Sequence, residues 1–154
     1  MNMNRIVFIV FFGALFFAGC QKDESKQDEI DRKKILDYIN EHNINALETP
    51  SGLFYVIENL GTGGHPNAYS TVSVRYTGYF LDGTIFDSNE GKELAPFSLG
   101  QVIKGWQEGI PLFKKGGTGK LLIPSRLAYG SNSAGYGIPD NSVLIFDIRL
   151  IDFN

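Results

Sequence analysis

A short apolar stretch around the only tryptophan of the chain is the first candidate for part of a functional site. The apolar residues that recur there at three- and four-residue spacing are Val102, Ile103, Trp106 and Ile110. This spacing predicts a short helix with one apolar face, which Pro111 ends. A large aromatic ring on that face would form the floor of a pocket for an apolar group, or it would simply fill the core.

More aromatic side chains are expected to converge on the same place. Residues 72–80 alternate between apolar and polar types, which predicts a half-buried strand that directs Tyr76 inward. The last strand, expected over residues 143–153, has an all-apolar face that includes Phe146. The aromatic residues expected to line one cleft are Tyr76, Phe86, Trp106, Tyr129 and Phe146. This set exceeds the needs of a core, and its tyrosine hydroxyls require partners, so it favours a binding pocket.

Residues for metal binding or nucleophilic catalysis are scarce. The chain has one cysteine and two histidines, whereas a structural zinc site needs about four such ligands in close pairs. His42 lies in a charged helical stretch and His65 in a Gly-Gly-His-Pro turn, so neither is expected to act as a general base. Cys20 has no second cysteine with which to form an internal disulfide. We therefore expect neither a metal nor a cofactor.

The glycine-rich turn over residues 114–119 invites comparison with a phosphate-binding loop. Lys114 stands where the first glycine of that motif belongs, and Leu121 replaces the Ser or Thr that would hold magnesium. The segment that follows, residues 120–124, is typical of a strand, whereas a phosphate-binding loop opens a helix. This motif is therefore excluded.

The order of the predicted elements indicates one α+β domain over residues 50–154. Strands are expected over 53–60, 72–80, 84–88, 120–124 and 143–153, with the short helix between the third and fourth. An antiparallel curved sheet of five to six strands, wrapped over that helix, fits this order. The length of 154 residues suits one domain with short extensions. The net charge of −3 argues against a general nucleic-acid binder.

Residues 1–19 are expected to be a lipoprotein signal peptide. The apolar run over 6–19 suits the core of a signal peptide and is shorter than the roughly 20 residues of a membrane span. The run ends in Phe17-Ala18-Gly19-Cys20, which resembles the lipobox of bacterial lipoproteins. That resemblance implies cleavage before Cys20 and lipid on its thiol. A signal without lipid and an uncleaved anchor are the alternatives.

Residues 20–49 are expected to form a charged tether and a helix. Gln21-Lys22-Asp23-Glu24 resembles the short acidic tag of some Bacteroidetes lipoproteins that are exported to the cell surface, and a plain solvated tether is the alternative. The helix is expected over 28–43 and has a narrow apolar stripe, which would dock on the domain or pair with a second copy. We expect a weakly docked spacer and a monomer.

Eight short motifs resemble, in order, those of the FKBP-type peptidyl-prolyl cis-trans isomerases. They are VRYTG at 74–78, DGTIFDS at 82–88, FSLG at 97–100, VIKGW at 102–106, IP at 123–124, LAYG at 127–130, IP at 138–139 and VLIFD at 143–147. The resemblance covers residues 51–152. It implies an FKBP-like fold and an isomerase that acts on proline-containing polypeptides and assists the folding of exported proteins. A non-catalytic peptide-binding or chaperone module that uses the same pocket is the alternative.

The resemblance also implies which residues form the site. They are Tyr76, Phe86, Asp87, Phe97, Val102, Ile103, Trp106, Tyr129, Ile138 and Phe146. Trp106 would be the floor, and the Tyr129 hydroxyl and the Ile103 N–H would donate to substrate carbonyls. Asp87 would orient Tyr76 or interact with the twisted carbonyl carbon. A macrolide inhibitor would fit the same pocket.

Two departures from the family pattern affect the rim of the site. The connection over residues 89–95 lacks the arginine that would pair with Asp87, and Lys92 is the available substitute. The loop over 131–137 matches poorly. With lipid on Cys20, the domain is expected at the outer membrane, facing the periplasm or the cell surface.

Overall fold

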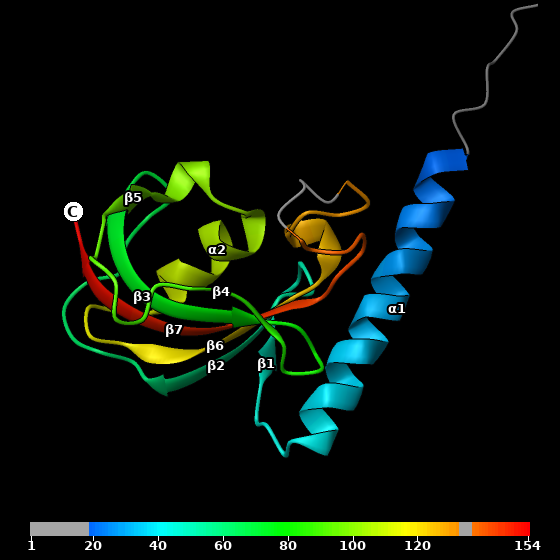
Figure 1. Ribbon diagram of the computed structural model, residues 1–154, viewed down its shortest axis with the longest axis horizontal. Coiled ribbons are helices and arrows are strands. Elements are labelled where there is room, and N and C mark those ends of the chain that lie inside the picture. The colour runs from blue at the N-terminus through cyan, green and yellow to red at the C-terminus, as the bar shows by residue number, and fades with distance from the viewer. Residues whose placement is uncertain (1–18, 133–136) are drawn as a thin grey trace, which may run out of the picture.

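The computed structural model describes residues 19–132 and 137–154, with side chains from residue 26 onward (Figure 1). Its elements in chain order are α1 (Gly19–Glu41), β1 (Leu47–Glu48), β2 (Phe54–Asn59), β3 (Thr71–Tyr79), β4 (Ile85–Ser88), β5 (Phe97–Ser98), η1 (Leu99–Gln101), α2 (Lys104–Gly109), η2 (Ile110–Leu112), β6 (Thr118–Ile123), η3 (Ser125–Leu127) and β7 (Leu144–Phe153). Residues 1–18 of the predicted signal peptide lie outside the described part. Within the described part, no helix has the length and apolar character needed to cross a bilayer.

One antiparallel sheet curves around α2 (Figure 1). Its strand order is β1-β2-β6-β7-β3-β4, and β5 also pairs with β3. The predicted curved antiparallel sheet over a short helix is thus confirmed. The sheet has seven strands, because β1 and β5 add two residues each. A two-residue strand is too short to show the alternation by which strands are recognised in a sequence.

The concave face of the sheet and α2 together enclose the main core. Alternate residues of β7 are buried there, and Leu144 and Leu150 have no exposed surface. Two glycines let α2 lie close to β6. A Cβ on Gly105 would lie 2.5 Å from Ile123 Cγ2, and one on Gly109 would lie 2.6 Å from a methyl of Leu121. Larger residues at these glycines would therefore push the helix away from the sheet.

The helix that carries Trp106 is shorter than its apolar spacing predicts. Val102 and Ile103 precede it in extended conformation, with ψ of 175° and 149°. The Ile103 carbonyl accepts from the N–H groups of Trp106 and Gln107 at 2.9 and 3.1 Å, so Ile103 is the N-cap. The prediction that these two residues share a helical face with Trp106 was wrong. The helical spacing of apolar residues in a sequence does not reveal at which residue the first helical hydrogen bond forms.

The α1 helix packs against the domain, at the end of the sheet where β1, η3 and the start of β7 meet (Figure 1). Ile35 has no exposed surface and belongs to a second apolar cluster with Phe54, Leu122, Val143 and Ile145. Arg32 donates from two nitrogens to the Glu48 carboxylate on β1, both at 2.8 Å. The expected weak docking was therefore wrong. The outer face of β6 and β7 is apolar at this end and needs a cover.

We predict that Ile35→Ala lowers the free energy of unfolding by about 2–5 kcal/mol, because it removes a fully buried side chain from the cluster. Ile30→Ala is the matched control on the same helix, since Ile30 is 39% exposed. Its cost should stay below about 1 kcal/mol. Urea denaturation followed by circular dichroism measures both variants. Equal small losses would contradict the docking of α1.

Candidate functional site

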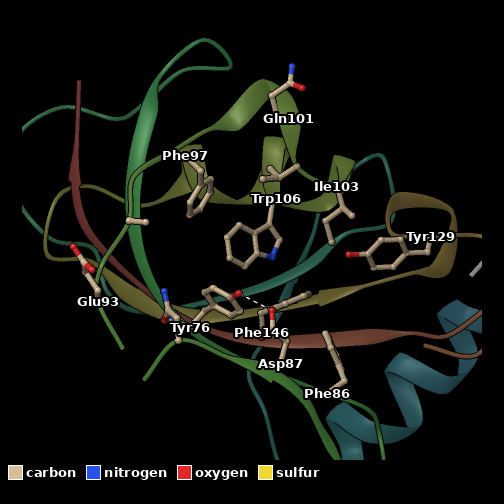
Figure 2. Close-up of a pocket in the computed structure, with 13 residues that line it drawn as sticks. Tyr76, Phe86, Asp87, Glu93, Phe97, Gln101, Ile103, Trp106, Tyr129 and Phe146 are labelled. Atoms are coloured by element: carbon tan, nitrogen blue, oxygen red, sulfur yellow. Dashed lines mark hydrogen bonds between the residues drawn. The ribbon is translucent and has the colours of Figure 1, made fainter. Parts of the chain in front are cut away.

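A cavity of about 630 Å³ opens above Trp106, on the concave side of the sheet (Figure 2). It is lined by Tyr76, Phe86, Asp87, Asn89, Glu93, Ala95, Phe97, Gln101, Val102, Ile103, Trp106, Tyr129 and Phe146. All the site residues expected from the sequence except Ile138 are in this set. The lining residues come from β3, β4, β5, η1, α2, β7 and the loops beside them, which are far apart along the chain.

Trp106 forms the base of the cavity and is held by rings on three sides. Its ring centroid lies 5.0 Å from that of Tyr76 and 5.2 Å from that of Phe146, both edge-on, and 5.6 Å from that of Phe97. Edge-to-face pairs at these distances are favourable and fix the orientation of the indole. Trp106 Nε1 is buried and has no hydrogen-bond partner among the described residues. The base of the cavity is therefore an apolar surface.

Gly78 on β3 makes room for the wall opposite α2. A Cβ at this position would lie 2.7 Å from Phe86 Cζ and 2.8 Å from Phe146 Cε1, closer than carbon atoms can approach. The two rings instead meet edge-to-face, with centroids 5.5 Å apart. The glycine in the VRYTG motif thus has a packing reason, because any side chain would displace both aromatic walls.

Tyr76 and Asp87 form the hydrogen bond at the rim. The Tyr76 hydroxyl donates to Asp87 Oδ2 at 2.6 Å, shown by the dashed line in Figure 2. The pairing of β3 with β4 places Gly78 opposite Asp87, which brings the carboxylate within reach of Tyr76. Burial, followed by the hydrogen bond and the charge of Asp87, raises the pKa of Tyr76 well above its ordinary value. The hydroxyl therefore stays a protonated donor even at alkaline pH, where an ordinary tyrosine, with a pKa of about 10, begins to ionise.

The loop that follows β4 is fastened to β3 by two side chains that the sequence reasoning did not single out. Asn89 Oδ1 accepts from the Tyr76 N–H at 2.9 Å, and Asn89 Nδ2 donates to the Val74 carbonyl at 2.8 Å. Arg75 donates to the carbonyls of Asn89 and Lys92, both at 2.6 Å. An asparagine side chain mimics a peptide group, so Asn89 extends the strand pairing past the end of β4.

The expected pairing of Lys92 with Asp87 is not what the structure shows. Lys92 Nζ donates to the Ser88 carbonyl at 2.5 Å instead. The carboxylate therefore relies on the Tyr76 hydroxyl. The remaining lining residues missed by the sequence reasoning are Glu93 and Ala95, from the loop after β4, and Gln101, from the short turn η1; neither segment has a periodic pattern.

Tyr129 and Ile103 face the cavity from the side opposite Glu93 (Figure 2). The Tyr129 hydroxyl points toward the space above Trp106. The N–H of Ile103 precedes the first hydrogen bond of α2, so the helix itself supplies no acceptor for it. Ile138 is not among the lining residues; it is 6% exposed and packs in the main core. Because this buried cluster also contains Trp106 and Phe146, which line the cavity, the role of Ile138 in the site stays a prediction.

A preformed aromatic cavity with a few polar groups at its rim is the kind of site that binds an apolar stretch of polypeptide. A family model described as FKBP-type peptidyl-prolyl cis-trans isomerase matches residues 63–151. The chain belongs to this family.

Relatives agree with this assignment over most of the chain. It is 43% identical over 134 residues to the "FKBP-type peptidyl-prolyl cis-trans isomerase FkpA" of Aeromonas hydrophila, covering 84% of this chain and 50% of the relative. It is 49% identical over 104 residues to the "Outer membrane protein MIP" of Legionella longbeachae, covering 66% of this chain and 44% of the relative. The chain thus spans about half the length of the curated relatives it matches.

Solved structures show the same fold. The crystal structure of FkpA from Escherichia coli superposes with a TM-score of 0.74 at 36% identity, over 87% of this chain and 62% of that one. A peptidyl-prolyl cis-trans isomerase from Pseudomonas syringae pv. tomato superposes with a TM-score of 0.73 at 31% identity, over 84% of this chain and 95% of that one. The FKBP-like fold expected from the motifs is therefore confirmed.

We predict that Tyr76→Phe makes stability less sensitive to alkaline pH. The pKa of Tyr76 is raised in the folded chain, so the unfolded chain loses its proton first as pH rises past about 10. The stabilisation that the folded chain gains from the raised pKa of Tyr76 is complete below about pH 10. It declines above that pH until the pKa of Tyr76 in the folded chain is reached. Urea denaturation between about pH 9 and 11 should show a shallower decline for Tyr76→Phe than for the wild type. Tyr69→Phe, at a residue that is 94% exposed, is the control. Parallel curves for all three proteins would refute the raised pKa.

Proposed function

We propose that this chain is a peptidyl-prolyl cis-trans isomerase that rotates X–Pro bonds of exported polypeptides. The observation that carries the proposal is the cavity above Trp106, whose walls are rings and whose base presents no exposed polar atom. Membership of the FKBP-type family and the structural neighbours support it. The client is a proline-containing polypeptide, and its proline ring lies on the indole of Trp106.

The physics of the reaction suits a cavity without nucleophiles. Rotation breaks no covalent bond, and its barrier of about 18–20 kcal/mol comes from amide resonance. The planar amide is charge-separated and well solvated by water, whereas the twisted amide is less polar. An apolar cavity therefore binds the twisted form better than the planar form, which is differential binding of the transition state. A 10⁵-fold acceleration would require about 7 kcal/mol of such preference.

The polar groups at the rim hold the peptide while it turns. The Tyr129 hydroxyl and the Ile103 N–H donate to substrate carbonyls on one side of the cavity. On the other side, Asp87 fixes the Tyr76 hydroxyl and lies close to where the twisted carbonyl would be. The aromatic walls are Tyr76, Phe86, Phe97 and Phe146. The same cavity would accept a macrolide inhibitor.

The N-terminal segment supports a proposal for where the protein resides in the cell. We propose that Cys20 becomes the first residue of the mature chain and carries lipid. One acyl chain holds a protein only marginally, so firm attachment requires two or more. A relative named "Outer membrane protein MIP" supports membrane association. The domain would then face the periplasm or the cell surface.

The domain would act as a monomer, because Ile35, on the apolar stripe of α1, is already buried on its own domain.

We predict acceleration of X–Pro isomerisation by the purified chain in a protease-coupled or NMR exchange assay. Tyr129→Phe should lower kcat/KM about 2- to 10-fold, the equivalent of one hydrogen bond. Asp87→Leu should lower it about 10-fold or more, because it removes a charged acceptor. Glu90→Leu is the control, since Glu90 is an exposed acid outside the cavity lining.

The assay also separates catalysis from simple binding. A folded wild-type chain that binds proline peptides without accelerating their isomerisation would favour the non-catalytic module. Unchanged turnover in Asp87→Leu would refute the role given to that carboxylate.

We predict that Cys20→Ala releases the protein from the membrane fraction or blocks its processing. Mass spectrometry of the native protein should find Cys20 as the first residue with several acyl chains attached. An unmodified thiol on the mature chain would rule out the anchor. External protease on whole cells then distinguishes the two sides of the membrane. Digestion supports surface export through the acidic tag Lys22-Asp23-Glu24, and protection supports a periplasmic domain.

A further inference from the structure

The α1 helix directs two carboxylates at η3, the turn that leads to Tyr129. Asp28 and Asp31 are three residues apart and so lie on the same side of the helix. Asp28 Oδ1 pairs with Arg126 Nε at 2.7 Å. Asp31 Oδ2 accepts from the backbone N–H of Ser125 at 2.8 Å. These contacts join a helix outside the sheet to a segment of the cavity wall.

Asp31 is buried more deeply than docking of the helix requires. It has no exposed surface, and its other oxygen accepts from Gln27 Nε2 at 2.7 Å. A buried carboxylate is costly unless each oxygen is hydrogen-bonded, and an apolar residue of similar volume usually docks a helix equally well. Ile35 and the pair of Arg32 with Glu48 already hold α1 in place. The hydrogen bond to Ser125 is therefore the specific feature of Asp31.

Ser125 is the backbone anchor of the segment that carries Tyr129. Its carbonyl accepts from the N–H groups of Ala128 at 2.9 Å and Gly130 at 2.8 Å, which flank Tyr129 on both sides. The carbonyl of Gly130 in turn accepts from Asn141 at 2.8 Å. The backbone N–H of Ser125 itself donates to Asp31 on α1. The position of the Tyr129 backbone thus depends on a chain of hydrogen bonds that begins on α1.

We propose that Asp31 is a positioning residue for Tyr129, and that α1 is consequently part of the isomerase site. This inference rests on the proposed function, in which the Tyr129 hydroxyl donates to the substrate. A hydrogen-bond donor contributes to the reaction only when it is held within a few tenths of an ångström of its place. Without the Asp31 carboxylate, the Ser125 amide loses its acceptor and the tyrosine loses that restraint.

The first test compares variants in the full chain by their kcat/KM for X–Pro isomerisation. Asp31→Leu keeps approximately the side-chain volume without an acceptor and should lower kcat/KM about 2- to 10-fold, as Tyr129→Phe does. Asp31→Asn should retain most of the activity, because its amide oxygen still accepts from Ser125. Asp37→Ala is the matched control, since Asp37 is an exposed aspartate of the same helix. If Asp31→Leu does not fold, Asp31→Ala takes its place.

The second test shows whether Asp31 acts through Tyr129. In a Tyr129→Phe background, Asp31→Leu should lower kcat/KM little further, because the donor that it positions is already missing. Independent, multiplying losses would overturn the proposal and leave Asp31 a merely structural residue.

A third measurement does not depend on activity. Hydrogen exchange of the Ser125 and Gly130 amides should be faster in Asp31→Leu than in the wild type and in Asp37→Ala. Unchanged exchange would overturn the proposed link from α1 to Tyr129. An inactive wild-type chain would overturn the proposed function alone.

Discussion

The antiparallel pairing of β3 with β7 is the interaction on which the cavity depends. Tyr76 lies opposite Ile148, and Gly78 lies opposite Phe146, so one register places both aromatic side chains on the concave face. Trp106 packs edge-on against both rings, which support it beneath the cavity. A slip of one residue would turn one of these rings to the outer face of the sheet. The support of Trp106 at the base of the cavity therefore depends on the same strand register as the walls formed by Tyr76 and Phe146.

The parts of the fold that were predictable are those in which side-chain type repeats with a period. Alternation along β3 and β7 indicated which residues face inward, and Asp82-Gly83 indicated the turn between β3 and β4. The pattern predicted that Tyr76 and Phe146 face inward toward Trp106, and the pairing of β3 with β7 in the structure brings these rings together. The family motifs added Asp87, which no period would have revealed.

The parts that were not predictable depend on contacts between distant segments or on backbone detail. Asn89 acts as a substitute peptide group, and only the structure shows which strand it faces. Ile103 belongs to the apolar period of α2, yet it caps the helix. The docking of α1 arises from the burial of Ile35 against Phe54, Leu122, Val143 and Ile145, which come from distant parts of the sequence.

The outermost strands on both sides of the sheet are short. The outermost strand at one side, β1, has two residues, and at the other side β4 has four. A long open edge exposes rows of backbone N–H and C=O groups that add an extended chain as a further strand. Proteins that handle unfolded polypeptides meet such chains constantly, and strand addition would capture them through their backbones regardless of sequence. Neither outermost strand of the described sheet offers a long edge of that kind, so under the proposed function a client would be held at the cavity, by its aromatic walls and the donors at its rim. Such a client would leave once those contacts are lost, and the same surface would then be free for the next proline.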